Sequence, residues 1–288
     1  MYFLILGRET MATYKNWFTS NITDRKEKGI DLDVTIKKID EWNLDTPWDK
    51  ASENVVKLIA DLDKSIFIGL SGGLDSEYVC TVFEEAEVDY TPVLIKTEGN
   101  KAELEYAYDF LNRWGNNDKA VILEKKNVDM LSTYFYKLLT KCSGYGHNSV
   151  ATYMVGEYAK QNGGIYVMAE HLIDEYKTGG FKVGCNEWDF YNDLLLGDDN
   201  THYFFNYTPE ISAAMIREFP DYDDVQKCKS EFYGLKYRPK MQYEYDDTYN
   251  VALMKLRRSV WLDHNPNYTF GTRQEYLQML AEVKDERA

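Results

Sequence analysis

A short stretch near the end of the first quarter of the chain constrains the fold more than any other. Residues 66–70 read Ile-Phe-Ile-Gly-Leu, an apolar run of the kind that fills a strand buried on both faces. Residues 71–73, Ser-Gly-Gly, interrupt this run, and apolar side chains then recur at helical spacing from Tyr78 to Phe83. The pattern predicts a buried strand, a tight glycine loop and a helix.

The loop has the chemistry of an anion site. The adjacent glycines Gly72 and Gly73 let the backbone adopt conformations closed to other residues and let a ligand approach without meeting a Cβ. The first amides of the following helix lack partners within the helix, so they favour an anion such as phosphate. Ser71 and Ser76 add hydroxyl donors, and Asp75 places a carboxylate beside the phosphate, which favours a divalent cation between them. The loop therefore predicts a nucleotide bound with Mg²⁺.

The six residues Ser71-Gly72-Gly73-Leu74-Asp75-Ser76 resemble the pyrophosphate loop of the N-type ATP pyrophosphatases, which are adenine nucleotide alpha hydrolase-like proteins, and every position matches. The superfamily includes asparagine synthetases, GMP and NAD synthetases, argininosuccinate synthetase, 7-cyano-7-deazaguanine synthase and tRNA lysidine synthetase. The resemblance implies that this loop holds the β- and γ-phosphates of ATP, which is split into AMP and pyrophosphate. It also implies that Leu70 and Thr97, at the ends of the first two strands, lie beside the adenine and ribose.

The other common phosphate loop, which ends in Gly-Lys-Ser or Gly-Lys-Thr, does not occur in the sequence. We therefore do not expect a P-loop kinase or GTPase.

Beyond the loop, short apolar runs alternate with helical segments. Further strands are expected over 90–97, 120–123 and 163–169, and helices over 101–114, 130–140 and 149–162. This alternation predicts an α/β, Rossmann-like fold with a doubly wound parallel sheet, because right-handed crossovers place helices on both faces. Ligands of such sheets bind at the carboxyl ends of the strands. We expect residues 71–76, 97–100 and those after 169 to share one crevice.

The same patterns divide the chain into an N-terminal extension at 1–48, an ATP-binding domain at 49–180 and a mostly helical substrate region at 181–288. Within the last, Thr208-Pro209-Glu210 has the signature of a helix start. In glutamine-dependent synthetases an amidotransferase domain begins with a cysteine nucleophile, whereas Met1 is followed here by Tyr2. We expect no glutaminase half.

A second chemical signal follows the strand at 163–169. Residues 169–176, Ala-Glu-His-Leu-Ile-Asp-Glu-Tyr, resemble the Gly-Glu-Gly-x-Asp-Glu stretch of asparagine synthetases, with alanine for the first glycine and one more residue between Glu and Asp. The resemblance implies that Glu170 acts as a base or orients the nucleophile, and that Asp174 binds Mg²⁺ together with Asp75. The alternative is an acidic helix start, where the helix dipole favours Asp and Glu.

A basic cluster lies within the C-terminal region and consists of Lys227, Lys229, Lys236, Arg238 and Lys240. Arg238-Pro239-Lys240 resembles an Arg-x-Lys element of asparagine synthetases, which implies that Arg238 contacts the nucleotide and Lys240 the phosphates and the adenylated intermediate. Negative charge accumulates on the α-phosphate as the substrate oxygen attacks, so a cation there is physically reasonable. The alternative is a solvated basic turn. Five tyrosines between 233 and 249 predict aromatic packing, with base stacking as the other reading.

Composition limits the partners. The 33 basic and 48 acidic side chains give a formal charge of −15, whereas proteins that grip nucleic acid or anionic membranes normally present a basic face. No apolar run approaches the roughly 18 residues of a membrane-spanning helix. The cysteines, Cys80, Cys142, Cys185 and Cys228, are too widely spaced for a metal cluster or a disulfide framework. We expect a cytoplasmic protein that acts on a small molecule.

Together these features predict an AMP- and pyrophosphate-forming ligase that uses ATP and Mg²⁺, with Asp75 serving both catalysis and metal binding. A carboxylate or amide oxygen would be adenylated and then displaced by ammonia or an amine, as in an asparagine synthetase without its glutaminase domain. A separate ammonia donor and a second copy of the chain are the partners left open. Two alternatives remain: a nucleobase or tRNA modification enzyme similar to 7-cyano-7-deazaguanine synthase, and a nucleotide-binding regulatory protein without catalysis.

Overall fold

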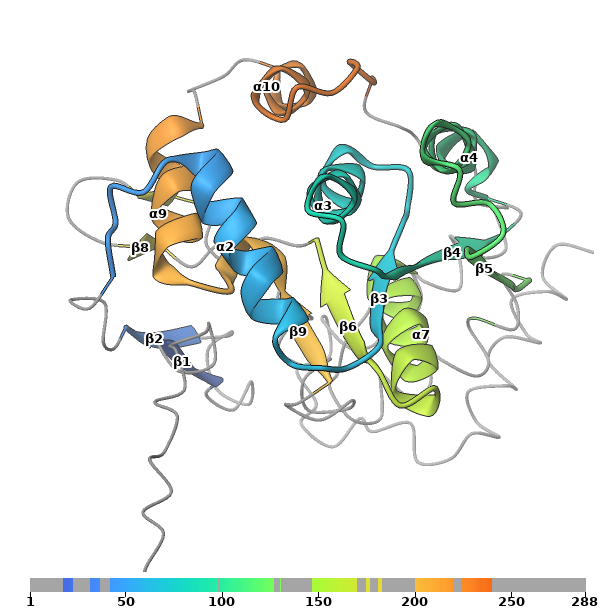
Figure 1. Cartoon of the computed structure of the whole chain (residues 1–288), viewed down its shortest axis with the longest axis horizontal. Helices are drawn as coiled ribbons and strands as arrows, with labels where there is room; N and C mark the ends of the chain where they lie inside the picture. The colour runs from blue at the N-terminus through green and yellow to red at the C-terminus, as the bar shows by residue number, and fades with distance from the viewer. Residues whose placement is uncertain are drawn as a thin grey trace, which may run out of the picture.

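The computed structural model describes most of residues 42–239 and two short strands before them (Figure 1). The described residues are 18–22, 32–36, 42–97, 99–126, 130, 147–169, 175–176, 181–182, 200–219 and 224–239. Three sequence-predicted site residues, Glu170, Asp174 and Lys240, lie outside them. Of the helix expected over 130–140, only residue 130 belongs to the described residues.

A parallel sheet of five strands forms the centre of the molecule, as predicted for an α/β fold. In chain order its strands are β3 (Ile66–Gly69), β4 (Thr91–Lys96), β5 (Val121–Glu124), β6 (Ile165–Met168) and β9 (Thr201–Tyr203). Their spatial order is β5-β4-β3-β6-β9, and every neighbouring pair is parallel. The chain therefore builds outward from β3 in one direction and then returns to build in the other. This reversal places a topological switch point at β3.

Helices cover both faces of the sheet. They are α2 (Trp48–Ala60), α3 (Leu74–Glu85), α4 (Lys101–Trp114), α7 (His147–Gln161), α9 (Pro209–Glu218) and α10 (Val225–Phe232), with a 3₁₀ turn η2 (Phe204–Asn206). In Figure 1, α3 and α4 lie above the strands and α7 below them. From β3, the chain adds β4 and β5 on one side of the sheet and β6 on the other. Because crossovers between parallel strands are right-handed, the helices of these two directions lie on opposite faces. The doubly wound topology is thus confirmed.

Local sequence explains where several elements begin and end. Ile66, Phe67 and Ile68 are all buried, as expected for the central strand, whereas β5 at the sheet edge alternates between half-buried and exposed residues. The bounds of α4 agree with the expected 101–114, and the helix ends at Gly115, whose φ of +68° suits a glycine C-cap. The hydroxyl of Thr208 accepts a hydrogen bond from the Ile211 amide at 3.3 Å, with proline at the first helical position. The predicted start of α9 is therefore confirmed.

Beyond residue 180, where we expected a mostly helical region, the described residues form α9 and α10 and also add one strand to the central sheet. Residues 201–203 form β9, which pairs with β6 and buries both Thr201 and Tyr203 completely. A three-residue strand is too short to show a hydrophobic period, so its place in the sheet depends on the neighbouring strand. The sheet thus takes a strand from beyond the expected boundary at 180, and the division into domains stays a prediction.

Two small antiparallel pairs complete the description: β1 (Phe18–Ile22) with β2 (Leu32–Ile36), and β7 (Glu175–Tyr176) with β8 (Phe181–Lys182).

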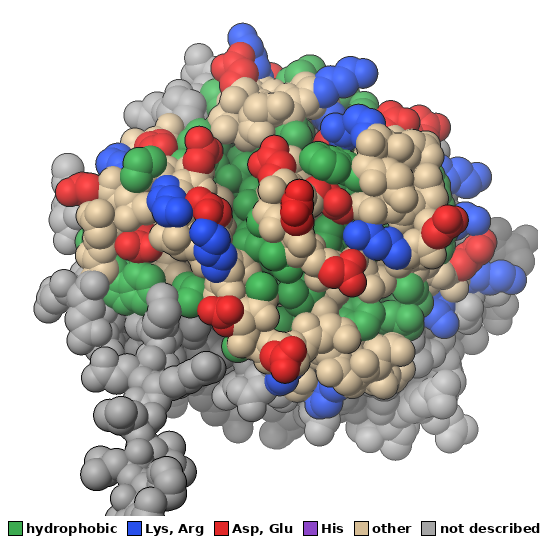
Figure 2. Space-filling model, viewed as in Figure 1, with side chains coloured by type: hydrophobic (Ala, Val, Ile, Leu, Met, Phe, Trp, Pro, Cys, Tyr) green, Lys and Arg blue, Asp and Glu red, His purple; other side chains and the backbone are tan. Residues whose placement is uncertain are grey.

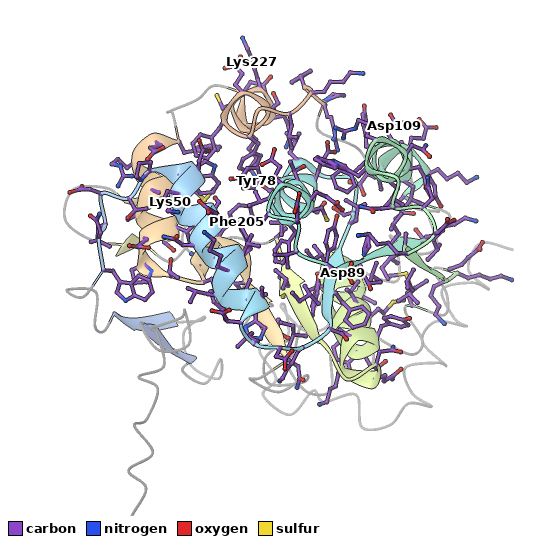
Figure 3. All side chains as sticks on the ribbon, in the orientation of Figure 1. Lys50, Tyr78, Asp89, Asp109, Phe205 and Lys227 are labelled. Atoms are coloured by element: carbon purple, nitrogen blue, oxygen red, sulfur yellow. The ribbon has the colours of Figure 1, made fainter. Side chains whose placement is uncertain are left out.

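An aromatic cluster holds α10 against the rest of the fold. It consists of Trp48, Tyr78, Phe205, Phe232 and Tyr233, which come from α2, α3, η2 and the end of α10. The Tyr78 and Tyr233 rings stack with centroids 4.5 Å apart, and the Tyr78 and Phe205 rings, labelled in Figure 3, stack at 6.1 Å. Each such pair contributes about 0.5–1.5 kcal/mol beyond area burial. The aromatic cluster therefore fixes where α10 meets α3.

One face of the described part of the chain is mixed in charge. On the face shown in Figure 2, acidic and basic side chains are interspersed over the part of the chain that the structure describes. No helix among the described residues is long and apolar enough to cross a membrane.

Candidate functional site

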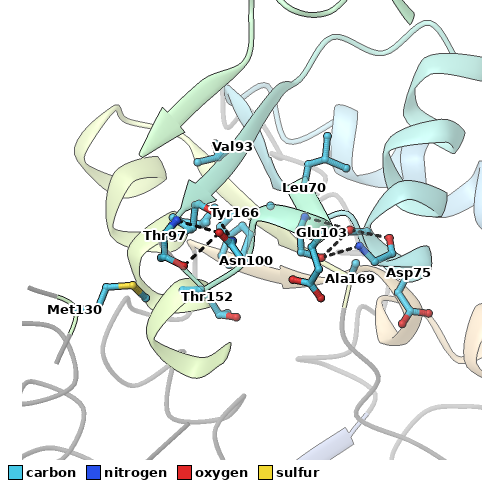
Figure 4. A pocket seen from close by; sticks show the side chains of 17 residues that line it. Leu70, Asp75, Val93, Thr97, Asn100, Glu103, Met130, Thr152, Tyr166 and Ala169 are labelled. Atoms are coloured by element: carbon cyan, nitrogen blue, oxygen red, sulfur yellow. Dashed lines mark hydrogen bonds between the residues drawn. The ribbon is translucent and has the colours of Figure 1, made fainter. Parts of the chain in front are cut away.

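A cavity of about 290 Å³ lies at the carboxyl end of the sheet, beside the switch point (Figure 4). It is lined from the end of β3 by Ser71, from α3 by Asp75, from the end of β4 by Thr97, from α7 by Thr152 and after β6 by Ala169. Two of the three segments expected to share a crevice, 71–76 and 97–100, thus line one cavity together with Ala169. The residues directly after Ala169, which form the third segment, lie outside the described ones. Open parallel sheets bind ligands at this position.

The polar end of the cavity is formed by the glycine loop. The Ser71 and Ser76 hydroxyl oxygens lie 3.0 Å apart, and the Ser71 amide donates to the Ser76 hydroxyl at 3.2 Å. The Ser71 hydroxyl accepts from the Gly73 amide at 3.2 Å, and the Ser76 hydroxyl donates to the Gly73 carbonyl at 3.0 Å. These bonds hold the two serines at the cavity wall, where α3 begins.

The two glycines of the loop have different roles. Gly72 has a φ of +88°, and a Cβ built on it would lie 2.0 Å from the Glu103 carbonyl oxygen of α4. Gly73 has a φ of −74°, and its Cβ would meet only the Ser71 hydroxyl at 3.3 Å. The conformational freedom that two adjacent glycines allow is therefore used at Gly72 and not at Gly73. The close approach of the loop to α4 requires the first glycine.

The end of β4 is shaped by Asn100. Its side-chain oxygen accepts from the Thr97 amide at 2.9 Å, and its side-chain nitrogen donates to the Ile95 carbonyl at 2.7 Å. The Thr97 hydroxyl accepts from the Gly99 amide at 3.2 Å. A tight turn therefore directs Thr97 toward the cavity.

The end of the cavity away from Asp75 is largely apolar. Figure 4 shows Val93, Thr97 and Met130 on this side and Asp75 with Glu103 on the other. Ile95, Ala151, Val155 and Tyr166 also line the cavity. The cavity thus joins a polar end at a helix start to an apolar end between β4 and α7.

Of the nine residues expected to bind the nucleotide, six line the cavity: Leu70, Ser71, Gly73, Asp75, Ser76 and Thr97. The other three are Gly72, Leu74 and Arg238. Gly72 packs against α4, and Leu74 is buried in the core. The roles of all nine in binding stay predictions.

Asp75 is held by α10. The Lys229 ammonium lies 2.5 Å from its Oδ2, and the Tyr233 hydroxyl donates to its Oδ1 at 2.7 Å. Both carboxylate oxygens therefore bind donors at the place where we expected a metal ion. No group of three or more His, Cys, Asp or Glu residues that could hold a metal occurs among the described residues. The described residues do not fit an Mg²⁺ site in this arrangement.

Arg238 contacts the loop from outside the cavity. Its guanidinium donates to the Gly72 carbonyl, pairs with the buried Glu77 and packs 4.6 Å from the Tyr106 ring centroid. Arg113 lies 2.5 Å from the other oxygen of Glu77. Only 5% of Arg238 is exposed, and burial lowers the pKa of its guanidinium to about 10. Arg238 is thus buried, so the alternative of a solvated turn is wrong at this position.

Sequence reasoning did not single out Lys229 or Tyr233 as partners of Asp75. Lys229 appeared only as a member of the basic cluster, and Tyr233 only as a packing residue. Their spacing of four places them on one face of α10, which is a signal that two side chains share a target. The target itself depends on where α10 docks.

No family model matches the sequence, and no curated protein matches it. Three solved structures that resemble the chain are synthetases. An NH3-dependent NAD synthetase from Campylobacter jejuni has 16% identity and a TM-score of 0.38, covering 84% of this chain and 95% of its own. An NMN synthetase from Francisella tularensis has 13% identity and a TM-score of 0.34, covering 78% and 95%. A glutamine-dependent NAD+ synthetase from Acinetobacter baumannii has 12% identity and a TM-score of 0.39, covering 90% and 51%.

NAD synthetases are members of the N-type ATP pyrophosphatases. This is the superfamily whose pyrophosphate loop is similar to residues 71–76 of this chain. Because the TM-scores are below 0.5, neither the fold nor the function of this chain is inferred from these structures.

Proposed function

We propose that this chain, whose loop resembles that of the N-type ATP pyrophosphatases, binds ATP in the cavity beside β3 and forms AMP and pyrophosphate. The observation that carries the proposal is the position of Ser71–Ser76. The loop lies between the central strand and the start of α3, at one end of a cavity of about 290 Å³ whose other end is largely apolar. A nucleotide has the same polarity, with phosphates at one end and a flat base at the other.

The geometry supports a role for each part of the loop. The Ser71 and Ser76 hydroxyls and the start of α3 would bind the β- and γ-phosphates. Gly72 presents no side chain where the loop approaches α4. The departing pyrophosphate gains negative charge as the α-phosphorus is attacked, so donors already in place stabilise the transition state. The resemblance of residues 71–76 to the pyrophosphate loop favours the AMP-forming reaction over transfer of the terminal phosphate.

The acceptor would be a carboxylate or amide oxygen, with ammonia or an amine displacing AMP. Ammonia would come from solution or from a separate donor protein. The asparagine synthetase-like version of this reaction stays a prediction, because Glu170, Asp174 and Lys240 lie outside the described residues. Mg²⁺ binding by Asp75 and Asp174 also stays a prediction, because Asp174 lies outside the described residues, and no step is assigned to the ion.

The test uses ATP labelled at the α-phosphate, incubated with the purified protein and Mg²⁺. The acceptor panel contains amino acids, nucleobases and nicotinic acid adenine dinucleotide, each with and without ammonia, and AMP is separated from ADP. We expect AMP and pyrophosphate that depend on one acceptor. Production of ADP would contradict the proposal.

Ser71→Ala gives the matched test of the loop. It removes one phosphate donor and should slow AMP formation on the order of 10². The control is Ser65→Ala, which changes an exposed serine just before β3 and should keep the wild-type rate. Equal rates for the two variants would show that the Ser71 hydroxyl has no part in the reaction.

One observation favours a second candidate, a nucleotide-binding regulatory protein. Both oxygens of Asp75 are bound by α10, so the carboxylate expected to serve catalysis is engaged elsewhere. This candidate predicts ATP binding with no AMP from any acceptor in the panel.

A further inference from the structure

The carboxylates that line the cavity would repel a bound polyphosphate. Two carboxylates, Asp75 and Glu103, line the cavity near the loop. Among the described lining residues there is no lysine and no arginine. A triphosphate would therefore meet like charges at close range, which disfavours binding unless a cation compensates them.

Among the described contacts, Lys229 is the cation that pairs with one of these two carboxylates, Asp75. Its ammonium lies 2.5 Å from Oδ2 of Asp75, and its side chain is only 17% exposed. The Tyr233 hydroxyl donates to Oδ1 at 2.7 Å. An ammonium and a phenol thus occupy the two oxygens that a divalent ion would otherwise use.

The contact is fixed by the surrounding packing. Tyr233 is 7% exposed, and its ring stacks at 4.5 Å on Tyr78 of α3 and at 6.2 Å on Trp48 of α2. A few residues further on, Arg238 donates to the carbonyl of Gly72 in the loop. The segment 229–238 is therefore anchored to the loop and its helix at several points. Lys229 belongs to this docked segment and is not an isolated surface side chain.

We propose that the Lys229 ammonium is the resident cation of the phosphate loop. It neutralises Asp75 in place of a divalent ion, and Tyr233 orients the carboxylate for this pair. The inference rests on the proposed ATP binding and adds that ATP binds without a divalent cation. Lys229 is a positioning residue that acts through Asp75.

The experiment measures the Kd of ATP for the full chain by calorimetry, once in EDTA and once in excess Mg²⁺. We expect wild-type affinities within a few-fold of each other in the two buffers. Lys229→Met should weaken binding by about tenfold or more in EDTA, because Asp75 then repels the phosphates. Excess Mg²⁺ should restore most of this loss, because the ion can take the carboxylate that the ammonium has left.

Three further variants separate charge from structure. Lys227→Met is the matched control, since this lysine lies on the same helix with 65% of its side chain exposed and points away from the molecule in Figure 3. It should leave both affinities unchanged. Lys229→Arg keeps the cation and should retain binding in EDTA. Tyr233→Phe keeps the stacked ring and removes only the hydroxyl, so it should weaken binding in EDTA even if Lys229→Met does not fold.

Several outcomes would overturn the inference. Wild-type binding that requires Mg²⁺ would show that the ammonium cannot replace the ion, while the proposed function would stand. A loss for Lys229→Met that is equal in both buffers would point to a structural role alone. Unchanged affinity in EDTA for both Lys229→Met and Tyr233→Phe would show that ATP binding does not depend on the Lys229–Asp75 pair, and would also overturn the inference. Absence of ATP binding by the wild type in either buffer would remove the proposed function and this inference with it.

Discussion

Residues that are adjacent in the glycine loop are required for different physical reasons. Gly72 is needed for its backbone conformation and for its close approach to Glu103, whereas Gly73 has an ordinary φ before the first turn of α3. Ser71 and Ser76 are needed for hydroxyls that bond within the loop. Identical residue types in one motif can thus have unequal tolerance to substitution.

This difference predicts unequal effects of adding one methyl group. Gly72→Ala places a Cβ 2.0 Å from the Glu103 carbonyl oxygen at a φ of +88°, so the loop must move. The free energy of unfolding should fall by about 2 kcal/mol and the affinity for ATP should fall with it. Gly73→Ala is the control and should cost less than about 1 kcal/mol, as for an alanine at a helix N-cap. Urea unfolding followed by circular dichroism measures both, and equal losses would contradict the steric argument.

At the scale of elements, helices are held by partners far away in the chain. The N-cap of α2 is Pro47, which makes no side-chain cap bond. The carboxylate of Glu218, at the end of α9, accepts from the Trp48 amide at 3.2 and 3.3 Å. Thr46 donates through its hydroxyl to Glu210 of α9 at 3.2 Å. The start of α2 is therefore capped by α9.

Removal of this distant cap should destabilise the protein. Glu218→Ala leaves the first amide of α2 without its anionic acceptor, and the free energy of unfolding should fall by about 1 kcal/mol. Glu231→Ala is the control, since its side chain is 66% exposed and lies 4.0 Å from Lys227. The control should change stability by less than about 0.5 kcal/mol. A Glu218 variant as stable as the control in urea would show that water caps the helix equally well.

At the scale of the whole molecule, the core contains tyrosines whose hydroxyls are withdrawn from water. Burial raises the pKa of Tyr207 to about 12, and it also raises the pKa values of Tyr78 and Tyr90. All three stay protonated in the folded protein well above the pH at which an unfolded tyrosine ionises, about 10.

Stability should consequently fall in alkaline solution. Above about pH 10 the unfolded state releases phenolic protons that the folded state retains, so the free energy of unfolding decreases as pH rises. The loss should be on the order of 2 kcal/mol for each of the three tyrosines by about pH 12. Urea unfolding at a series of pH values measures it, and Tyr207→Phe should reduce the slope. Tyr237→Phe, which removes an exposed phenol, should keep the wild-type slope. Stability independent of pH above about 10 would contradict the assignment.

Local features of this protein could be predicted from sequence because their causes lie within a few residues. The strand, loop and helix at 66–85 follow from an apolar run, two glycines and a helical period. The start of α9 follows from Thr208 and the proline after it, and the end of α4 from Gly115. The alternation of strands and helices was enough to predict a doubly wound sheet with its crevice at the carboxyl ends.

The partners within the site were decided by tertiary structure. Lys229 lies 154 residues from Asp75 along the chain, Arg238 lies 166 from Gly72, and Glu218 lies 170 from Trp48. No local pattern encodes such pairs, because each depends on how α10 and α9 pack against the earlier helices. The sequence alone therefore determined that a glycine loop lies between a buried strand and a helix. Only the packing of the folded chain decided which cation and which hydroxyl meet its carboxylate.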